Sequence, residues 1–157
     1  MKKIALTVLA LVGLTTAAVA AENTNPHFRK GYGADVQFSV QSVNDFHITT
    51  SHGYGFGNGI YLGGGAGFGA EWEGRGVEGT PHYVPSLFVE ARWSMLGSAA
   101  VSPYINLRGV QYIDLAEGAT NYGVIPSIGL DMGRFSFGIG YAIRKQNALQ
   151  FGVGFRF

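Results

Sequence analysis

Apolar and polar residues alternate along most of this chain, and the C-terminus shows the pattern most clearly. The chain ends FGVGFRF (151–157), in which every odd position is apolar and every even position is glycine or arginine. Successive side chains of a β-strand point to opposite faces of the strand. The ending therefore predicts a strand with one apolar face and one sparse polar face. Such an apolar face is buried against a second sheet in a soluble protein, or faces lipid in a membrane barrel.

The same alternation predicts eight β-strands and almost no helix after residue 20. The predicted strands are 31–41, 46–57, 59–73, 82–96, 101–113, 121–132, 134–145 and 148–157. Strands of roughly ten residues with a period of two and short connections are typical of transmembrane barrels. Their apolar face contains no Asp, Glu, Lys or Arg, whereas a soluble sandwich carries charges on its outer faces. The predicted fold class is therefore all-β, an eight-stranded antiparallel up-and-down transmembrane β-barrel.

The first 20 residues predict export from the cytoplasm. MKKIALTVLALVGLTTAAVA (1–20) has two lysines, an apolar core and a final Ala-Val-Ala, which is the layout of a secretory signal peptide. The core is too short to cross a bilayer as a mature helix, which needs about 20 apolar residues. We therefore predict a signal peptide at 1–20 and one barrel domain at 21–157. The chain contains no cysteine, which excludes a lipid-anchored lipoprotein.

Composition and net charge indicate which kinds of partner the mature chain can bind. Glycine accounts for 25 of the 157 residues, and aromatic residues make up 13%. The formal net charge of +1 becomes −1 when the two charges of Lys2 and Lys3 are removed with the signal peptide. The mature chain therefore has no basic surface for nucleic acid, and we predict no nucleic-acid partner.

Connection lengths predict an orientation in the membrane. With the N-terminus in the periplasm, the connections after the second, fourth and sixth strands are periplasmic, and all three are short. The longest connection, 73–82, then lies outside the cell, which is the asymmetry usual for such barrels.

Three prolines are exceptions to the strand pattern. Pro85, Pro103 and Pro126 lie within predicted strands, on the outward face. Proline cannot donate to the hydrogen-bond ladder of a sheet. We therefore expect a bulge or a break of register near each of them.

Two segments resemble a known family of membrane proteins. TTSHGYGFGNGIYLGGGAGFG (49–69) and the C-terminal strand resemble the small eight-stranded outer-membrane barrels of the OmpA/OmpX type, and the resemblance covers essentially all of 31–157. It implies location in the outer membrane, with outer-membrane lipid and the outer-membrane assembly machinery as partners. In that family, a terminal Phe preceded by alternating aromatic residues resembles the signal that this machinery reads. The resemblance implies that Phe151, Phe155 and Phe157 form such an assembly signal here.

Eight charged residues share the inward face of the predicted barrel. They are Asp35, Glu71, Glu90, Asp131, Arg92, Arg108, Arg144 and Arg156. An eight-stranded barrel is only wide enough for side chains to fill it, and unpaired buried charges are costly, so we expect a paired network. The glycines at alternate positions of 63–69 are expected to leave space for the long arginines. This predicts a plugged lumen, and the alternative is a narrow ion or solute pore lined by the same charges.

No motif in the sequence predicts catalysis. GYGFGNG and GGGAGFG superficially resemble phosphate-binding loops, but their glycines have a period of two and no helix follows. His47 shares the inward face with Thr49 and Ser51 and lies near Asp45, which is predicted to be in a loop. Such a set could cleave an acyl ester, but the motifs of the lipid A-modifying barrels are missing, so an enzyme is the least favoured alternative. No metal site and no cofactor are predicted.

The predicted function is that of a non-enzymatic integral outer-membrane protein with a structural or accessory role. Gly64, Ala66 and Ala70 form a smooth outward surface where a barrel of a larger outer-membrane complex could pack. In the alternative interpretation these residues only face lipid. His52 also falls on the outward face, where we expect a residue of the membrane interface.

Overall fold

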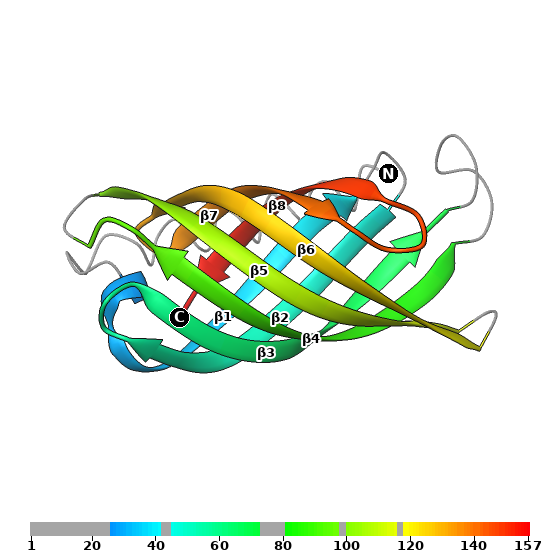
Figure 1. The fold of residues 1–157 in the computed structure, drawn as a ribbon, viewed down its shortest axis with the longest axis horizontal. Coiled ribbons are helices and arrows are strands. Elements are labelled where there is room, and N and C mark those ends of the chain that lie inside the picture. The colour runs from blue at the N-terminus through cyan, green and yellow to red at the C-terminus, as the bar shows by residue number, and fades with distance from the viewer. Residues whose placement is uncertain (1–25, 42–44, 73–80, 98–99, 116–117) are drawn as a thin grey trace, which may run out of the picture.

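The structure, a computed structural model, describes residues 26–41, 45–72, 81–97, 100–115 and 118–157. Its elements are η2 (Pro26–Phe28), a short 3₁₀ helix, followed by the strands β1 (Lys30–Gln41), β2 (Asp45–Phe56), β3 (Ile60–Glu71), β4 (His82–Ser94), β5 (Val101–Asp114), β6 (Ala119–Met132), β7 (Phe135–Ala142) and β8 (Ala148–Arg156). Each strand pairs antiparallel with the next, and β8 pairs with β1 to close the barrel (Figure 1). The predicted eight-stranded antiparallel up-and-down fold is confirmed. The predicted signal peptide lies outside the described residues.

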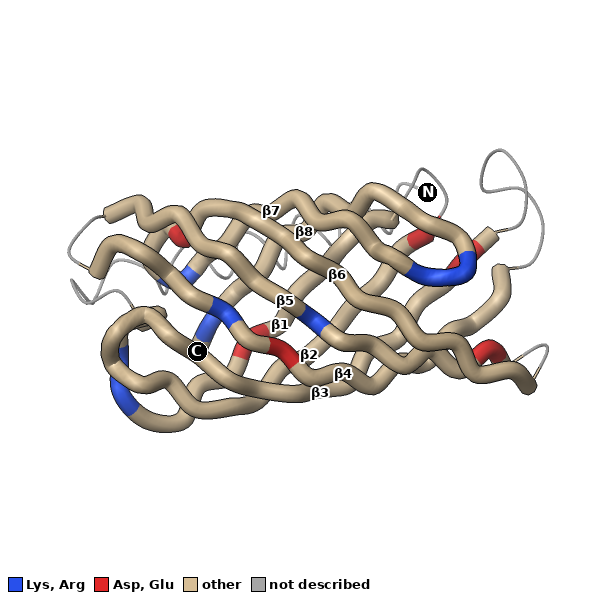
Figure 2. Tube along the Cα trace, in the orientation of Figure 1, with Lys and Arg blue, Asp and Glu red and all other residues tan. Residues whose placement is uncertain are grey.

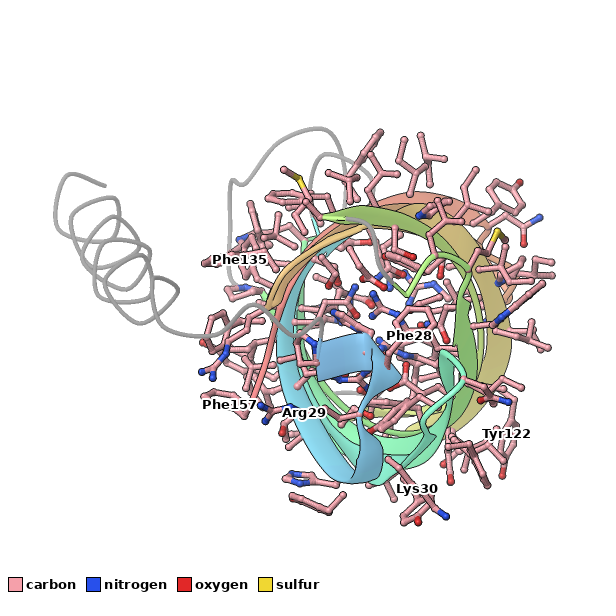
Figure 3. All side chains as sticks on the ribbon, turned by 90° about the vertical axis from the view of Figure 1, so that its left-hand side faces the viewer. Phe28, Arg29, Lys30, Tyr122, Phe135 and Phe157 are labelled. Atoms are coloured by element: carbon pink, nitrogen blue, oxygen red, sulfur yellow. The ribbon has the colours of Figure 1, made fainter. Side chains whose placement is uncertain are left out.

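The alternation of the sequence becomes the inside and the outside of the barrel wall. In β4, Val89 is 68% exposed, whereas the next residue, Glu90, is 6% exposed. Viewed along the barrel axis, side chains radiate outward from the strands and also fill the space that the strands enclose (Figure 3). Among the described strand residues, the outward positions carry one charge, Lys30 at the start of β1. The barrel is therefore apolar outside and polar inside, the reverse of a soluble protein.

The two ends of the barrel differ in their connections. The terminal end holds η2, the C-terminus and the connections after β2, β4 and β6, and the loop end holds the other four connections (Figure 1). Gly57, Gly59 and Gly133 in the terminal-end turns have positive φ angles of 82°, 84° and 60°, a conformation that favours glycine. The longest connection, 72–81, lies at the loop end, on the side opposite the connections 57–59, 95–100 and 133–134, as predicted. Most of the longest connection (73–80) is outside the described residues.

The predicted breaks of register at the prolines are wrong. β5 and β6 keep one register through Pro103 and Pro126, and β3 and β4 keep one register through Pro85. Each proline lies instead where the ladder on its other side stops: β4–β5 pairing begins after Pro85 and ends next to Pro103, and β6–β7 pairing is interrupted at Pro126. On the far side of Pro126 the β6–β7 register is unchanged: the backbones of Val124 and Ile143 are hydrogen-bonded to each other at the positions that this register predicts. A strand residue directs its N–H to one neighbour only, so each proline interrupts one ladder and spares the other.

The strand bounds agree with the predicted bounds to within a few residues. β7 differs most, since it ends at Ala142 and not at 145. Its ladder with β6 is interrupted at Pro126, and beyond Ala142 the described residues of the two segments are linked by the single Val124–Ile143 bridge. None of the described residues belongs to a helix that is long and apolar enough to cross a membrane.

Candidate functional site in the barrel lumen

The lumen holds all eight charged side chains that the sequence placed on the inward face. They form a terminal-end layer (Asp35, Arg92, Asp131, Arg156), a middle layer (Glu90, Arg108) and a loop-end layer (Glu71, Arg144). Six of the eight are buried, and the two of the loop-end layer are partly buried. Charged positions accordingly lie within the strands as well as at the ends of the barrel (Figure 2).

The middle layer is built around the carboxylate of Glu90. Arg108, its direct partner in the β4–β5 register, donates to Oε2 from Nη2 at 2.8 Å and from Nε at 3.3 Å. Asn106 donates to the same oxygen at 3.3 Å, and the hydroxyl of Ser51 donates to Oε1. The guanidinium of Arg108 lies 4.2 Å from the ring centroid of Phe88. Both carboxylate oxygens therefore have donors, and a buried arginine balances the charge.

The terminal-end layer is built around Asp131, whose side chain is fully buried. Arg92 donates from Nη2 to Oδ1, and Ser94 donates to Oδ2 at 2.6 Å. The guanidinium of Arg92 lies 3.7 Å from the ring centroid of Tyr104. These residues belong to β4, β5 and β6, so the layer ties three strands together from the inside.

Arg156 of β8 extends the terminal-end layer to β1 and β3. Its Nη2 lies 3.8 Å from Oδ2 of Asp35, and its guanidinium lies 4.1 Å from the ring centroid of Tyr61. The hydroxyl of Tyr61 is hydrogen-bonded to that of Ser51 at 3.0 Å, and Ser51 also donates to the middle layer. The two layers therefore form one continuous polar network.

Sequence reasoning missed His27, which η2 places in the terminal-end layer. Its side chain is buried, with Nδ1 2.9 Å from Nη1 of Arg156 and Nε2 3.5 Å from Oδ1 of Asp131. His27 precedes the first alternating segment of the chain. No periodicity in the sequence therefore indicates that this side chain lies inside the barrel.

The loop-end layer is organised by Arg144, just beyond the end of β7. It donates to Glu71 at 2.7 Å and to Asp45 at 3.3 Å, and it lies 5.0 Å from the ring centroid of Tyr112. Nε2 of His47 lies 3.5 Å from the same oxygen of Glu71. Asp45 was predicted to lie in a loop, but it begins β2 and contacts this layer, because the strand starts one residue earlier than predicted.

An apolar cluster lies between the middle layer and the loop-end layer. Its members are Val84, Phe88, Val110, Tyr112, Ile125, Ala142 and Ala148. Two small cavities among the described lumen residues have volumes of about 10 Å³ each, room for about one water molecule. Apolar side chains therefore occupy part of the lumen alongside the charged layers.

The prediction that the glycines of β3 leave space for the arginines is wrong. A Cβ on Gly65 would lie 2.7 Å from the ring of Phe88, and one on Gly69 would overlap the imidazole of His47. The bare face of β3 thus receives aromatic and imidazole rings from β2 and β4. The arginines lie over such rings and not directly on the glycines: Arg108 covers the ring of Phe88, which itself packs on Gly65.

The residues that the sequence suggested as a hydrolytic set do not face one another as such a set in the structure. Ser51 donates to Glu90 in the middle layer, whereas His47 faces Glu71 in the loop-end layer. Asp45 is bound by the arginine of the loop-end layer. The three groups therefore serve different structural contacts. Among the described residues, no three His, Cys, Asp or Glu side chains are arranged to hold a metal ion.

The three phenylalanines of the predicted assembly signal lie on the outward side of the C-terminal segment. Phe151 is exposed on β8, and Phe155 packs against Phe135 and Phe157 with centroid distances of 5.2 and 5.1 Å. The N–H of Phe157 donates to the carbonyl of Ala34 in β1 at 2.9 Å. The last residue therefore takes part in closing the barrel, and its role in assembly stays a prediction.

Removing Phe157, or changing it to Asp, is expected to lower the amount of assembled protein severalfold. Both changes remove the outermost aromatic side chain from an exposed position directly after the closing strand. The heat-modifiable band in isolated outer membranes measures assembly. Phe56→Asp, at an exposed aromatic position that ends β2, is the control and should assemble better. Full assembly of both Phe157 variants would contradict the signal.

The outward surface of β1, β2 and β3 carries one polar cluster. The hydroxyl of Tyr32 is hydrogen-bonded to Nδ1 of His52 at 2.6 Å, and Thr50 is bonded to Nε2 at 3.1 Å. The register partners of Thr50 and His52 on β3 are Ala66 and Gly64, so the wall beside the cluster is smooth. His52 lies on the outward face, as predicted. A lateral partner on this surface stays a prediction.

Fold and lumen together define a class: a closed eight-stranded up-and-down barrel with an apolar exterior and an ion-paired interior. The crystal structure of Neisserial surface protein A (NspA) is similar, with a TM-score of 0.51 and 14% identity over 80% of this chain and 92% of that chain. The Yersinia pestis outer membrane protein Ail in a phospholipid bilayer nanodisc has a TM-score of 0.48 and 14% identity over 82% of this chain and 100% of that chain. The de novo designed protein TMB2.3 has a TM-score of 0.47 and 13% identity over 81% of this chain and 94% of that chain.

No protein-family model and no curated protein matches this chain. The similarity to NspA is one of structure only, and it shows that the two proteins share the fold of a small eight-stranded barrel. The predicted resemblance to small outer-membrane barrels is confirmed at this level.

Proposed function

We propose that this protein is an integral outer-membrane β-barrel with a side-chain-plugged lumen and a non-enzymatic, structural or accessory role. The proposal rests on the way side chains occupy the interior of the barrel. Three charged layers and an apolar cluster occupy it in series from the terminal end to the loop end. Each acid of these layers has an arginine partner, so the charges act as a substitute for a hydrophobic core.

The exterior supports a position in lipid. Its described strand residues are apolar except for a few polar side chains and one terminal lysine. Tyr32, Trp93 and Phe157 are exposed towards the terminal end, and Tyr83 and Tyr122 are exposed towards the loop end. Tyr and Trp are enriched where a membrane meets water, since one part of each ring is apolar and another is polar. Two aromatic girdles on an apolar band are the arrangement of outer-membrane barrels.

The proposed location also uses the predicted signal peptide. Export followed by closure of a barrel with an apolar wall leads to the outer membrane, where backbone groups must all be paired. The partners on this proposal are outer-membrane lipid and the outer-membrane assembly machinery. A larger outer-membrane complex remains a further proposed partner. The non-enzymatic role is supported by the structural contacts that occupy Ser51, His47 and Asp45.

The purified barrel in a planar lipid bilayer is expected to show no steady conductance. Paired side chains lie in the water path, and two cavities among them have room for about one water molecule each. Heat-modifiable migration of the recovered protein provides the control that folded barrels were present in the bilayer. A stable, ion-selective current whose selectivity changes in Glu90→Gln would overturn the plug and support the narrow pore.

A further inference from the structure

The terminal end of the barrel is covered by η2, the segment that precedes the first strand. Figure 3 shows η2 lying across the opening that the strands enclose, with Phe28 directed over it. The ring of Phe28 packs directly on two glycines of the terminal-end connections: a Cβ would lie 2.9 Å from the ring at Gly59 and 2.8 Å from it at Gly97. The carbonyl of Pro26 accepts a hydrogen bond from the N–H of Arg29 at 3.3 Å, which holds the turn together.

The side chain of His27 points from η2 into the lumen and is 2% exposed. Arg156 faces Nδ1 at 2.9 Å, and Asp131 faces Nε2 at 3.5 Å. A guanidinium only donates hydrogen bonds, so Nδ1 must accept and the proton of a neutral imidazole lies on Nε2, towards the carboxylate. The docked segment therefore requires an uncharged His27.

We propose that the terminal-end mouth of the lumen is a binding site for the chain's own segment Pro26–Phe28, which docks with a neutral His27 and detaches when His27 takes up a proton. The inference rests on the plugged-lumen function proposed above and adds a movable part to it. Detachment would open the terminal-end layer to the periplasm, while the middle layer stays closed.

The charges around His27 come from several strands and favour its neutral form. The titratable and charged groups that face it or its partners are Arg92 (β4), Asp131 (β6), Arg156 (β8), Asp35 (β1), Tyr61 (β3) and Tyr104 (β5). β2 contributes Gly53 and Gly55 at this end, and its charged residue, Asp45, lies at the loop-end layer. Asp131 would attract a proton on His27, but Arg92 and Ser94 already bind its two oxygens. The two arginines therefore dominate.

The direction of the pH dependence follows from this environment. Burial, and then the charges of Arg92 and Arg156, lower the pKa of His27 from its usual 6.5 to about 2. A detached His27 titrates near its usual pKa, so protons bind the detached form more tightly. Docking is therefore strongest above pH 6.5 and weakens as the pH falls below that value. Between about pH 7.5 and about pH 5, the ratio of docked to detached segment is expected to fall by up to about 30-fold.

A nitroxide spin label next to the segment tests the inference. The chain has no cysteine, so Arg29→Cys at an exposed position accepts a single label. The full mature protein is folded into lipid vesicles, and the mobility of the label is recorded at about pH 7.5 and about pH 5. We expect an immobile label at the higher pH and a mobile population at the lower pH. His82→Gln, at the start of β4 on the loop end, is the control and should behave like the parent.

Two substitutions of His27 separate its charge from its bulk. His27→Gln cannot take up a proton but can accept from Arg156, so its label should stay immobile at both pH values. His27→Lys carries a permanent charge, so its label should be mobile at both. A parent label that is equally immobile at both pH values, or a glutamine variant that still responds to pH, would overturn the inference. A steady conductance at pH 7.5 would overturn the plugged-lumen function instead, which keeps the two failures distinguishable.

Discussion

Glu90→Ala is expected to lower the free energy of unfolding by about 3–5 kcal/mol, because it leaves a buried guanidinium without its counter-charge. Glu90 and Arg108 are each 6% exposed. The substitution removes at once the acceptor of Arg108, Asn106 and Ser51. Equilibrium unfolding by urea in lipid vesicles, followed by tryptophan fluorescence, measures the change.

Glu71→Ala is the matched control for this measurement. Glu71 also bonds an arginine, Arg144, at 2.7 Å, but its side chain is 25% exposed. Solvent screens such a pair, so the cost should stay below about 1 kcal/mol. The double variant Glu90→Ala/Arg108→Ala should lose less stability than the sum of its single variants, because no buried charge is left alone. Equal costs at Glu90 and Glu71 would contradict the view that burial of the middle layer stabilises the barrel.

Gly65→Ala in β3 is expected to lower the free energy of unfolding by about 1–3 kcal/mol. The added Cβ would lie 2.7 Å from the ring of Phe88 and closer still to the carbonyl oxygen of Thr50. That oxygen belongs to the neighbouring strand β2, so relief requires a shift of the barrel wall and not of one side chain. The same urea experiment measures the loss.

Gly109→Ala in β5 provides the comparison for Gly65→Ala. A Cβ at Gly109 would meet only a methyl group of Val89, at an ordinary contact distance of 3.7 Å. Its effect on the free energy of unfolding should stay within about 0.5 kcal/mol. A loss as large as that of Gly65→Ala would show that the conformational freedom of glycine, and not crowding in the lumen, causes the cost.

The faces of the strands were predictable because parity is a local property of the chain. Val110 and Tyr112 interrupt the polar inward face of β5 in the sequence, yet they keep the inward parity and join the apolar cluster. The prolines were harder to predict, because their effect depends on which neighbour the missing N–H would have faced. Strand pairing decides which neighbour that is, and the sequence does not show it. A break of register was therefore expected at Pro126, whereas the structure has one interrupted ladder with an unchanged register.

The partners within the lumen were not predictable from the sequence. The inward position of eight charges indicated a paired network, but not that Glu90 would bind the arginine directly opposite it in the register. Nor did it indicate that Arg144 would bind two acids of β2 and β3. Side chains that share one face differ in height along the barrel axis, and parity alone says nothing of height.

The sequence by itself therefore determined the number of strands, their up-and-down order and the side of the wall on which each side chain lies. These follow from the period of two and from the connection lengths, and both can be recognised within a short stretch of the chain. Only the tertiary structure decided the contacts: Arg92 meets Asp131 across 39 positions, and Arg156 meets His27 across 129. Closure of β8 on β1 and the stagger of the strands set the height of every side chain in the lumen, and both are properties of the whole barrel.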